Sequence, residues 1–165
     1  MKRFLLITWF ATAFIQASFA NKNYNESSLS QLLSLYYDVK NALVNSDAAT
    51  ASSKSGELLK AINSLDSSSL SETERKAFTS LHYKLAYDAR HISEVKDISH
   101  QREHFASLSL NMYTLAKAAK LSPQPVYEQY CPMKNAYWLS SEASIKNPYY
   151  GNEMLSCGEV KDTLK

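Results

Sequence analysis

A long stretch with almost no helix-breaking residues is the feature that most limits how this chain can fold. Residues 29–120 contain a single glycine, Gly56, and no proline. Glycine and proline destabilise helix interiors more than any other residues, so the stretch favours long helices. Its apolar residues recur at steps of three and four, which is the spacing of one helix face. The sequence therefore predicts helices across residues 29–120.

Four amphipathic helices are expected in this stretch. Asp47 and Asp97 are candidate N-caps of the second and fourth helices, and the run from Ser71 to Glu74 is a candidate capping box that opens the third. Four helices with short connections predict an up-and-down bundle. The expected buried positions are Leu29, Leu32, Leu33, Tyr36, Val39 and Leu43, then Leu58, Leu59, Ile62 and Leu65, then Phe78, Leu81, Leu85, Ile92 and Val95, and finally Ile98, Gln101, Phe105, Leu108, Met112, Leu115 and Ala119.

The remaining residues, 121–165, differ in composition. They hold all four prolines, both cysteines and two of the three glycines, with many tyrosines and Trp138. The segment has no sustained helical period, yet it is too aromatic for a disordered tail. We expect an irregular segment that packs its aromatic rings on the bundle and has room for one or two short strands or turns. The expected fold class is thus all-α, a four-helix bundle over 29–120 with this tail, in one domain spanning 21–165.

The first twenty residues have the pattern of a secretory signal. Lys2 and Arg3 precede an apolar run from Phe4 to Phe14, and the small residues Ser18 and Ala20 end the segment. This is the three-part signal that a signal peptidase removes, here near Ala20. The apolar run is shorter than the roughly 20 residues that a permanent membrane span needs. The sequence predicts a periplasmic protein that is not inserted in the membrane after cleavage.

Charge and motifs argue against two function classes. The chain has 18 basic and 16 acidic residues, and removal of Lys2 and Arg3 leaves 16 of each. A nucleic-acid partner requires a basic surplus that the mature chain lacks. The sequence also has no Gly-x-Ser-x-Gly turn, no phosphate-binding glycine loop and no His-Glu-x-x-His motif. We therefore expect no nucleic-acid partner, no catalytic residues and no enzymatic activity.

Sulfur-containing side chains are concentrated in the tail. Cys131 and Met133 form one step, and Met154 and Cys157 form a second step about 20 residues later. Thiolate and thioether sulfurs are the ligands that select Cu(I) and similar soft ions. The alternative is a Cys131–Cys157 disulfide, which an exported location permits and which would stabilise the fold by roughly 3 kcal/mol. Both interpretations remain open at this point.

Histidine is the second candidate metal ligand. His100 and His104 are four residues apart on a predicted helix, so their rings share a face and can both reach one ion. His91 can join them if the third and fourth helices turn tightly at Asp97, whereas we assign His82 a structural role. If the tail crosses the start of the fourth helix, its sulfurs and these imidazoles are expected to converge on one shared site.

Several of these runs resemble a known bacterial family. The run from Lys96 to Phe105 reads Lys-Asp-Ile-Ser-His-Gln-Arg-Glu-His-Phe, and the tail holds Tyr-Cys-Pro-Met at 130–133, Ile-Lys-Asn-Pro-Tyr-Tyr-Gly at 145–151 and Met-Leu-Ser-Cys-Gly at 154–158. With these runs the chain resembles the family called domain of unknown function 3347. Members of that family are exported, and some are joined to periplasmic adaptor subunits of copper and silver efflux pumps.

The resemblance implies a function and a ligand set. It implies a periplasmic protein that binds or handles a soft metal, Cu(I) first, with a heavy-metal efflux adaptor or pump as partner. The rival hypothesis is a non-catalytic helical interaction module stapled by a Cys131–Cys157 disulfide. The candidate metal ligands that the resemblance implies are His91, His100, His104, Cys131, Met133, Met154 and Cys157.

Overall fold

Four helices and a small sheet make up the part of the chain that the computed structural model describes, residues 28–165. The predicted signal segment and its cleavage point lie outside these residues. No helix within 28–165 is long and apolar enough to cross a membrane. The elements are α1 (Ser28–Val44), α2 (Ala48–Ser64), the short 3-10 helix η1 (Ser67–Ser69), α3 (Glu72–Glu94), α4 (Ile98–Ala118), β1 (Val126–Cys131), β2 (Ala136–Ser140), the 3-10 helix η2 (Gly151–Glu153) and β3 (Glu159–Leu164).

The helix starts are where the sequence predicts them. Asp47 accepts a hydrogen bond from the Thr50 amide at the start of α2, and Asp97 accepts one from the His100 amide at the start of α4. Ser71 and Glu74 form the full capping box of α3, each side chain accepting from the other's amide. Each of these side chains satisfies an amide that the helix itself leaves unpaired, which fixes where the helix begins.

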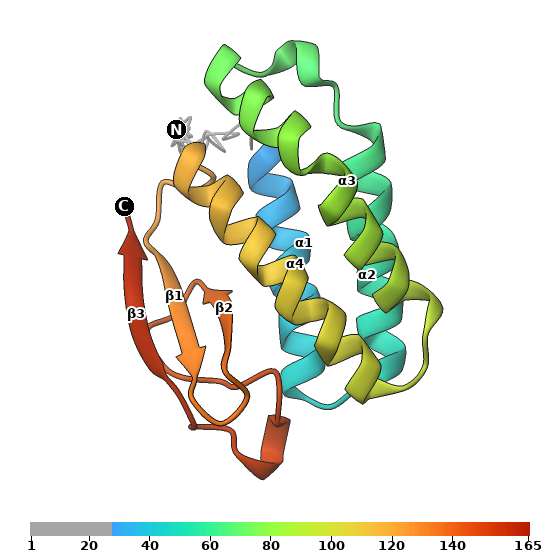
Figure 1. Cartoon of the computed structure of the whole chain (residues 1–165), viewed down its shortest axis with the longest axis vertical. Helices are drawn as coiled ribbons and strands as arrows, with labels where there is room; N and C mark the ends of the chain where they lie inside the picture. The colour runs from blue at the N-terminus through green and yellow to red at the C-terminus, as the bar shows by residue number, and fades with distance from the viewer. Residues whose placement is uncertain (1–27) are drawn as a thin grey trace, which may run out of the picture.

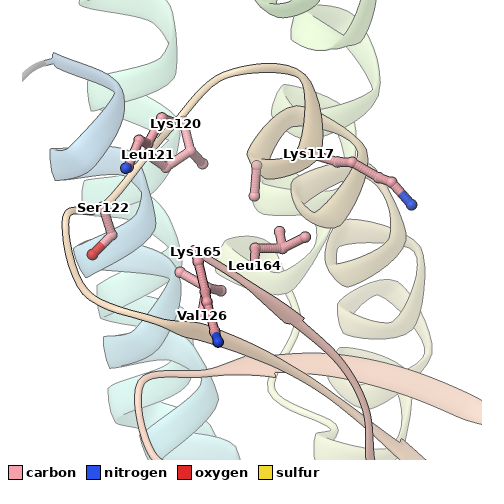
Figure 2. A pocket seen from close by; sticks show the side chains of 8 residues that line it. Lys117, Lys120, Leu121, Ser122, Val126, Leu164 and Lys165 are labelled. Carbon is pink, nitrogen blue, oxygen red and sulfur yellow. The ribbon is translucent and has the colours of Figure 1, made fainter.

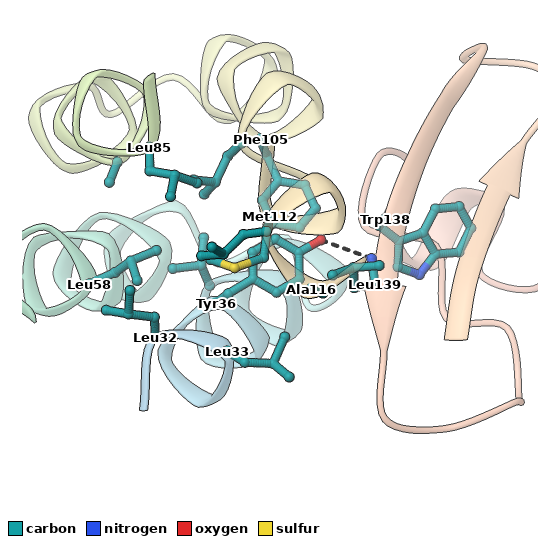
Figure 3. Close-up of a cluster of buried hydrophobic side chains, with 14 of the residues drawn as sticks. Leu32, Leu33, Tyr36, Leu58, Leu85, Phe105, Met112, Ala116, Trp138 and Leu139 are labelled. Carbon is teal, nitrogen blue, oxygen red and sulfur yellow. Dashed lines mark hydrogen bonds between the residues drawn. The ribbon is translucent and has the colours of Figure 1, made fainter. Parts of the chain in front are cut away.

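The four helices form the predicted up-and-down bundle (Figure 1). Leu32 and Tyr36 of α1, Leu58 of α2, Leu85 of α3 and Met112 of α4 meet in one apolar core, as Figure 3 shows. Of the predicted core positions, all but four are buried. Leu59, Leu65 and Ile98 pack on the core while partly exposed, and Val95 caps the end of α3.

The expectation of an all-α fold is wrong for the tail. Residues 126–164 form a three-stranded antiparallel sheet in the order β2-β1-β3, so the molecule is mostly helical with an added sheet. β1 and β2 form a hairpin, with Cys131 opposite Ala136, and Asn135 adopts a positive φ of 54° in the turn. Such a conformation is uncommon outside glycine, and asparagine tolerates it better than most residues.

Burial on both faces explains why the sequence did not reveal β2. Leu139 of β2 points toward the helices, and Trp138 points to the other side of the strand (Figure 3). Trp138 is covered there by the returning chain, with the Tyr149 ring 5.9 Å away. A strand buried on both faces loses the alternation of polar and apolar residues that identifies a half-buried strand.

Polar contacts of Tyr36 and Arg102 help to attach the sheet and the tail to the bundle. The Tyr36 hydroxyl accepts a hydrogen bond from the Leu139 amide at 2.9 Å, and it lies 2.7 Å from the Ser109 hydroxyl of α4. The Arg102 guanidinium of α4 donates to the Pro148 carbonyl at 2.9 Å and to the Leu43 carbonyl at 3.2 Å. The tail is therefore held against α1 and α4, as the sequence predicts.

Candidate functional site

The two cysteines lie side by side where β1 ends and the chain returns to β3. Their Sγ atoms are 3.9 Å apart, and both are free thiols in the structure. Cys131 is the last residue of β1, and Cys157 lies in the turn just before β3. The fold thus brings the two sulfur-bearing steps of the tail together at their cysteines.

The pairing of β1 with β3 brings the thiols together. Tyr130 pairs with Glu159, which sets Cys131 beside the turn that holds Cys157. Gly158 follows with a φ of 151°, and a side chain there would overlap the Trp138 ring and the Tyr130 carbonyl. Glycine is therefore required at this position, since it alone adopts that conformation without a clash.

The two thiols differ in exposure. Cys131 is fully buried and Cys157 is half-buried. Burial raises the pKa of the Cys157 thiol, and the neighbouring Cys131 raises it further, whereas the Met133 amide lowers it. A raised pKa keeps this thiol protonated at neutral pH unless a metal ion displaces the proton.

The two candidate methionines lie next to this pair in the chain. Met133 has 65% of its surface exposed, so its thioether projects to solvent. Met154 is half-buried, and its carbonyl accepts a hydrogen bond from the Cys157 amide at 3.0 Å. All four candidate sulfur residues thus lie near one end of the sheet. Among the described residues, the two thiols are the only sulfur groups of this set with a recorded contact to each other.

The candidate histidines form a second cluster, on α3 and α4. The His91 and His104 rings are stacked with centroids 4.5 Å apart, and the His100 ring lies 5.0 Å from that of His104. His104 Nδ1 is 3.1 Å from a carboxylate oxygen of Asp88, and His91 Nδ1 is 2.9 Å from the Tyr87 carbonyl. The tight turn at Asp97 therefore brings His91 to the other two, as predicted.

The histidines and the thiols do not form the expected shared site. Arg102 and His104 are two residues apart, so they project about 200° apart around α4. Arg102 faces the tail through its bonds to Pro148, whereas His104 faces Asp88 on α3. Within residues 28–165 no group of three or more His, Cys, Asp or Glu side chains is arranged to hold a metal ion.

One participant in the histidine cluster was not identified from the sequence. Asp88 is buried and pairs with His104 across the helix interface, 16 residues away in the chain. In the sequence it is only one of several acidic residues near a histidine, because the spacing gives no signal for a contact between two helices. The His82 ring packs edge-on against Phe78, with the ring centroids 5.5 Å apart.

A pocket lies at the opposite end of the sheet, between the end of α4, the start of β1 and the end of β3 (Figure 2). Its apolar lining comes from all three segments, and its polar groups are mainly ammonium groups, which repel cations and have no lone pair for a metal, with the hydroxyl of Ser122 beside them. The pocket is therefore no candidate metal site. Its lining includes Leu121, Val126 and Leu164, with Lys117, Lys120 and Lys165.

A comparison with protein families identifies where the chain belongs. The family model described as "Protein of unknown function (DUF3347)" matches residues 32–124. The chain belongs to this family. The match spans most of α1, all of α2, α3 and α4, and therefore the three clustered histidines, and it ends before β1 and the cysteines. No curated protein and no solved structure matches the chain.

Proposed function

We propose that this DUF3347 protein binds one soft metal ion, Cu(I) first, between the thiolates of Cys131 and Cys157. The observation that supports this most directly is the 3.9 Å separation of the two Sγ atoms. Two sulfurs bound at about 2.3 Å to one ion lie roughly 3.8 Å apart at a tetrahedral angle and about 4.6 Å apart in a line. The pair therefore needs little movement to bind an ion, and thiolates favour Cu(I) over harder ions.

The surroundings of the pair suit uptake and release of an ion. Cys131 is buried, which shields a bound Cu(I) from solvent, whereas the half-exposed Cys157 gives access from outside. Met133 is exposed two residues after Cys131, and Met154 precedes Cys157 by three residues. A thioether that turns inward from either residue would supply a third soft ligand, so we propose both methionines as auxiliary ligands.

We also propose where the protein acts and with which partner. The signal-like residues 1–20 favour export to the periplasm, and the resemblance to domains joined to copper and silver efflux adaptors favours an efflux adaptor or pump as partner. In this setting the protein acts as a store or donor of the ion and catalyses no reaction. Loss of the protein should then raise the sensitivity of cells to copper.

A second function rests on the same pair of residues. Thiols 3.9 Å apart are also close enough to close to a disulfide, which would join two segments separated by 26 residues in the chain. The protein would then be an interaction module whose tail is stapled by this disulfide. The state of the thiols in protein taken from the periplasm separates the two functions.

An anaerobic Cu(I) titration followed by native mass measurement tests the proposal. We expect two free thiols in the periplasmic protein and one tightly bound Cu(I) per chain. Cys131→Ser or Cys157→Ser should abolish tight binding, because one thiolate cannot retain the ion alone. Ser156→Ala, next to Cys157 and exposed, is the matched control and should bind normally. A periplasmic protein with no free thiol and no Cu(I) uptake would favour the stapled module.

A further inference from the structure

The pocket beside the end of α4 has an apolar floor and a basic rim (Figure 2). Its volume is about 150 Å³, the size of an engineered apolar cavity that binds benzene. The dithiol proposal makes no use of this pocket, since the cysteines lie at the other end of the sheet. No acidic side chain is among the described residues that line it, which are Ala116, Lys117, Lys120, Leu121, Ser122, Val126, Leu164 and Lys165.

The fold holds the walls of this pocket in place. Val126 of β1 pairs with Leu164 of β3, so their side chains lie on the same face of the sheet. The Leu121 carbonyl accepts a hydrogen bond from the Ser30 hydroxyl of α1 at 2.7 Å, which anchors the wall that follows α4. Two prolines stiffen the connection from there to β1. A pocket that is formed in advance reduces the ordering cost of binding.

Two of the three ammonium groups at the rim have no partner of their own. The Lys117 ammonium donates to the Tyr113 hydroxyl at 3.3 Å, and that hydroxyl donates to an Asp162 oxygen at 2.7 Å. Neither Lys120 nor Lys165 forms an ion pair or a side-chain hydrogen bond within the described part of the chain. Unpaired positive charges beside an apolar floor are complementary to an anion with an apolar body.

A hydroxyl group at the rim adds a neutral donor. The Ser122 oxygen accepts a hydrogen bond from the Gln124 amide at 3.0 Å. Its own proton has no acceptor among the residues that the structure describes, so it can donate to an oxygen of a bound anion. A hydrogen bond to a charged acceptor is stronger than one between neutral groups.

We propose that this pocket binds a small monocarboxylate whose apolar body is about the size of a benzene ring. The apolar body covers Leu121, Val126 and Leu164, and this burial of apolar surface favours binding. The carboxylate stays at the rim with the ammonium groups of Lys120 and Lys165. A single charge suits the pocket better than phosphate does, because each further charge would lose hydration beside the apolar floor.

A benzoate titration followed by nuclear magnetic resonance of the methyl groups tests the proposal. Benzoate should shift the methyl resonances of Leu121, Val126 and Leu164 and saturate at one molecule per chain. Benzamide has the ring without the charge, and acetate has the charge without the ring. Each should therefore bind at least about tenfold more weakly than benzoate.

Charge variants give a second test. The double variant Lys120→Gln with Lys165→Gln should bind benzoate about tenfold more weakly, because each exposed ion pair contributes a few-fold in affinity. Lys134→Gln is the matched control, since it removes an equal exposed charge in the turn between β1 and β2 and should bind like the parent chain.

Three results would overturn the proposal: equal binding of benzamide and benzoate, unchanged benzoate affinity in the double lysine variant, or resonance shifts away from the pocket. None of these results bears on the dithiol, because Cu(I) binding should be unchanged in the lysine variants. Conversely, Cys131→Ser should lose Cu(I) and still bind benzoate.

Discussion

The Tyr36 side chain of α1 connects its own helix to α4 and to the sheet. The side chain is fully buried in α1, stacks on Phe105 of α4 and accepts a hydrogen bond from the Leu139 amide of β2. Ser109 lies within hydrogen-bond distance of the same oxygen. Tyr36 was predicted as a core residue from its place on the apolar face of the first helix. Its polar contact with the sheet was not predicted, because the partner is 103 residues away.

Replacing Tyr36 by Phe should destabilise the protein by about 1–3 kcal/mol. The change leaves the Leu139 amide and the Ser109 hydroxyl buried without this partner, and an unsatisfied buried polar group costs about that much. Urea unfolding followed by circular dichroism measures the loss. Tyr37→Phe is the matched control, because the Tyr37 hydroxyl is buried with no hydrogen-bond partner among the described residues. An equal loss in the two variants would contradict this role for the Tyr36 hydroxyl.

Stability should also fall in alkaline solution. Burial raises the pKa of the Tyr36 and Tyr149 hydroxyls above the usual value of about 10. The unfolded chain therefore loses these protons at a lower pH than the folded chain. The protonated tyrosine hydroxyls make their full contribution to the free energy of unfolding below about pH 10, and this contribution decreases as the pH rises further. The midpoint of urea unfolding measured from pH 8 to pH 11 should show the decline, and Tyr36→Phe should show a shallower one.

At the scale of elements, local signals predicted the helices well and the strands poorly. The N-caps Asp47 and Asp97 and the capping box at Ser71 are confirmed, because a cap is formed by residues no more than three positions apart. β2 was missed because four of its five residues are buried, which removes the alternation that marks a strand. The expectation that the tail packs on the bundle is nevertheless confirmed.

Arg102 is the side chain that joins α4 to the returning tail, so Arg102→Lys should loosen that segment. One guanidinium donates to Pro148, Leu43 and Ser46 at once, whereas an ammonium group cannot match this planar arrangement. We expect a loss of about 1–3 kcal/mol, since buried carbonyls lose their donor. Hydrogen exchange should quicken at the Gly151 amide, which bonds to Asn147.

Arg90→Lys, on the exposed side of α3, is the control for this change. Its exchange rates and unfolding midpoint should match those of the parent chain. Unchanged exchange at Gly151 in Arg102→Lys would show that the tail is held by its apolar contacts alone.

At the scale of the whole molecule, the bundle and the sheet share one core. Leu108 of α4 and Leu139 of β2 are both fully buried in the same cluster. A domain of this size with a continuous core is expected to unfold in a single transition. Trp138 is the only tryptophan after residue 20, so its fluorescence reports on the sheet, while circular dichroism reports mainly on the helices.

Leu108→Ala should lower the stability of both parts together by roughly 2–5 kcal/mol, because it opens a cavity in the shared core. Fluorescence and circular dichroism should give the same shifted midpoint. Leu110→Ala, on the exposed face of α4, is the control and should cost far less. Two separate midpoints would show that the sheet and the bundle fold as independent units.

The sequence by itself determined the features that depend on neighbouring residues. The four helices, their caps, most core positions and family membership follow from local spacing and from runs of residues. The sequence placed His91 near His100 and His104 only on the condition of a tight turn at Asp97, a condition that the packing of α3 on α4 meets.

Only the tertiary structure decided which distant side chains meet. It places Cys131 beside Cys157 through the pairing of β1 with β3, and it places Asp88 behind His104 through the packing of α3 on α4. It also leaves the thiols and the imidazoles out of any common group, since no three His, Cys, Asp or Glu side chains among residues 28–165 are arranged to hold a metal ion. Such contacts depend on how elements are oriented against one another, which the spacing of residues along the chain does not specify.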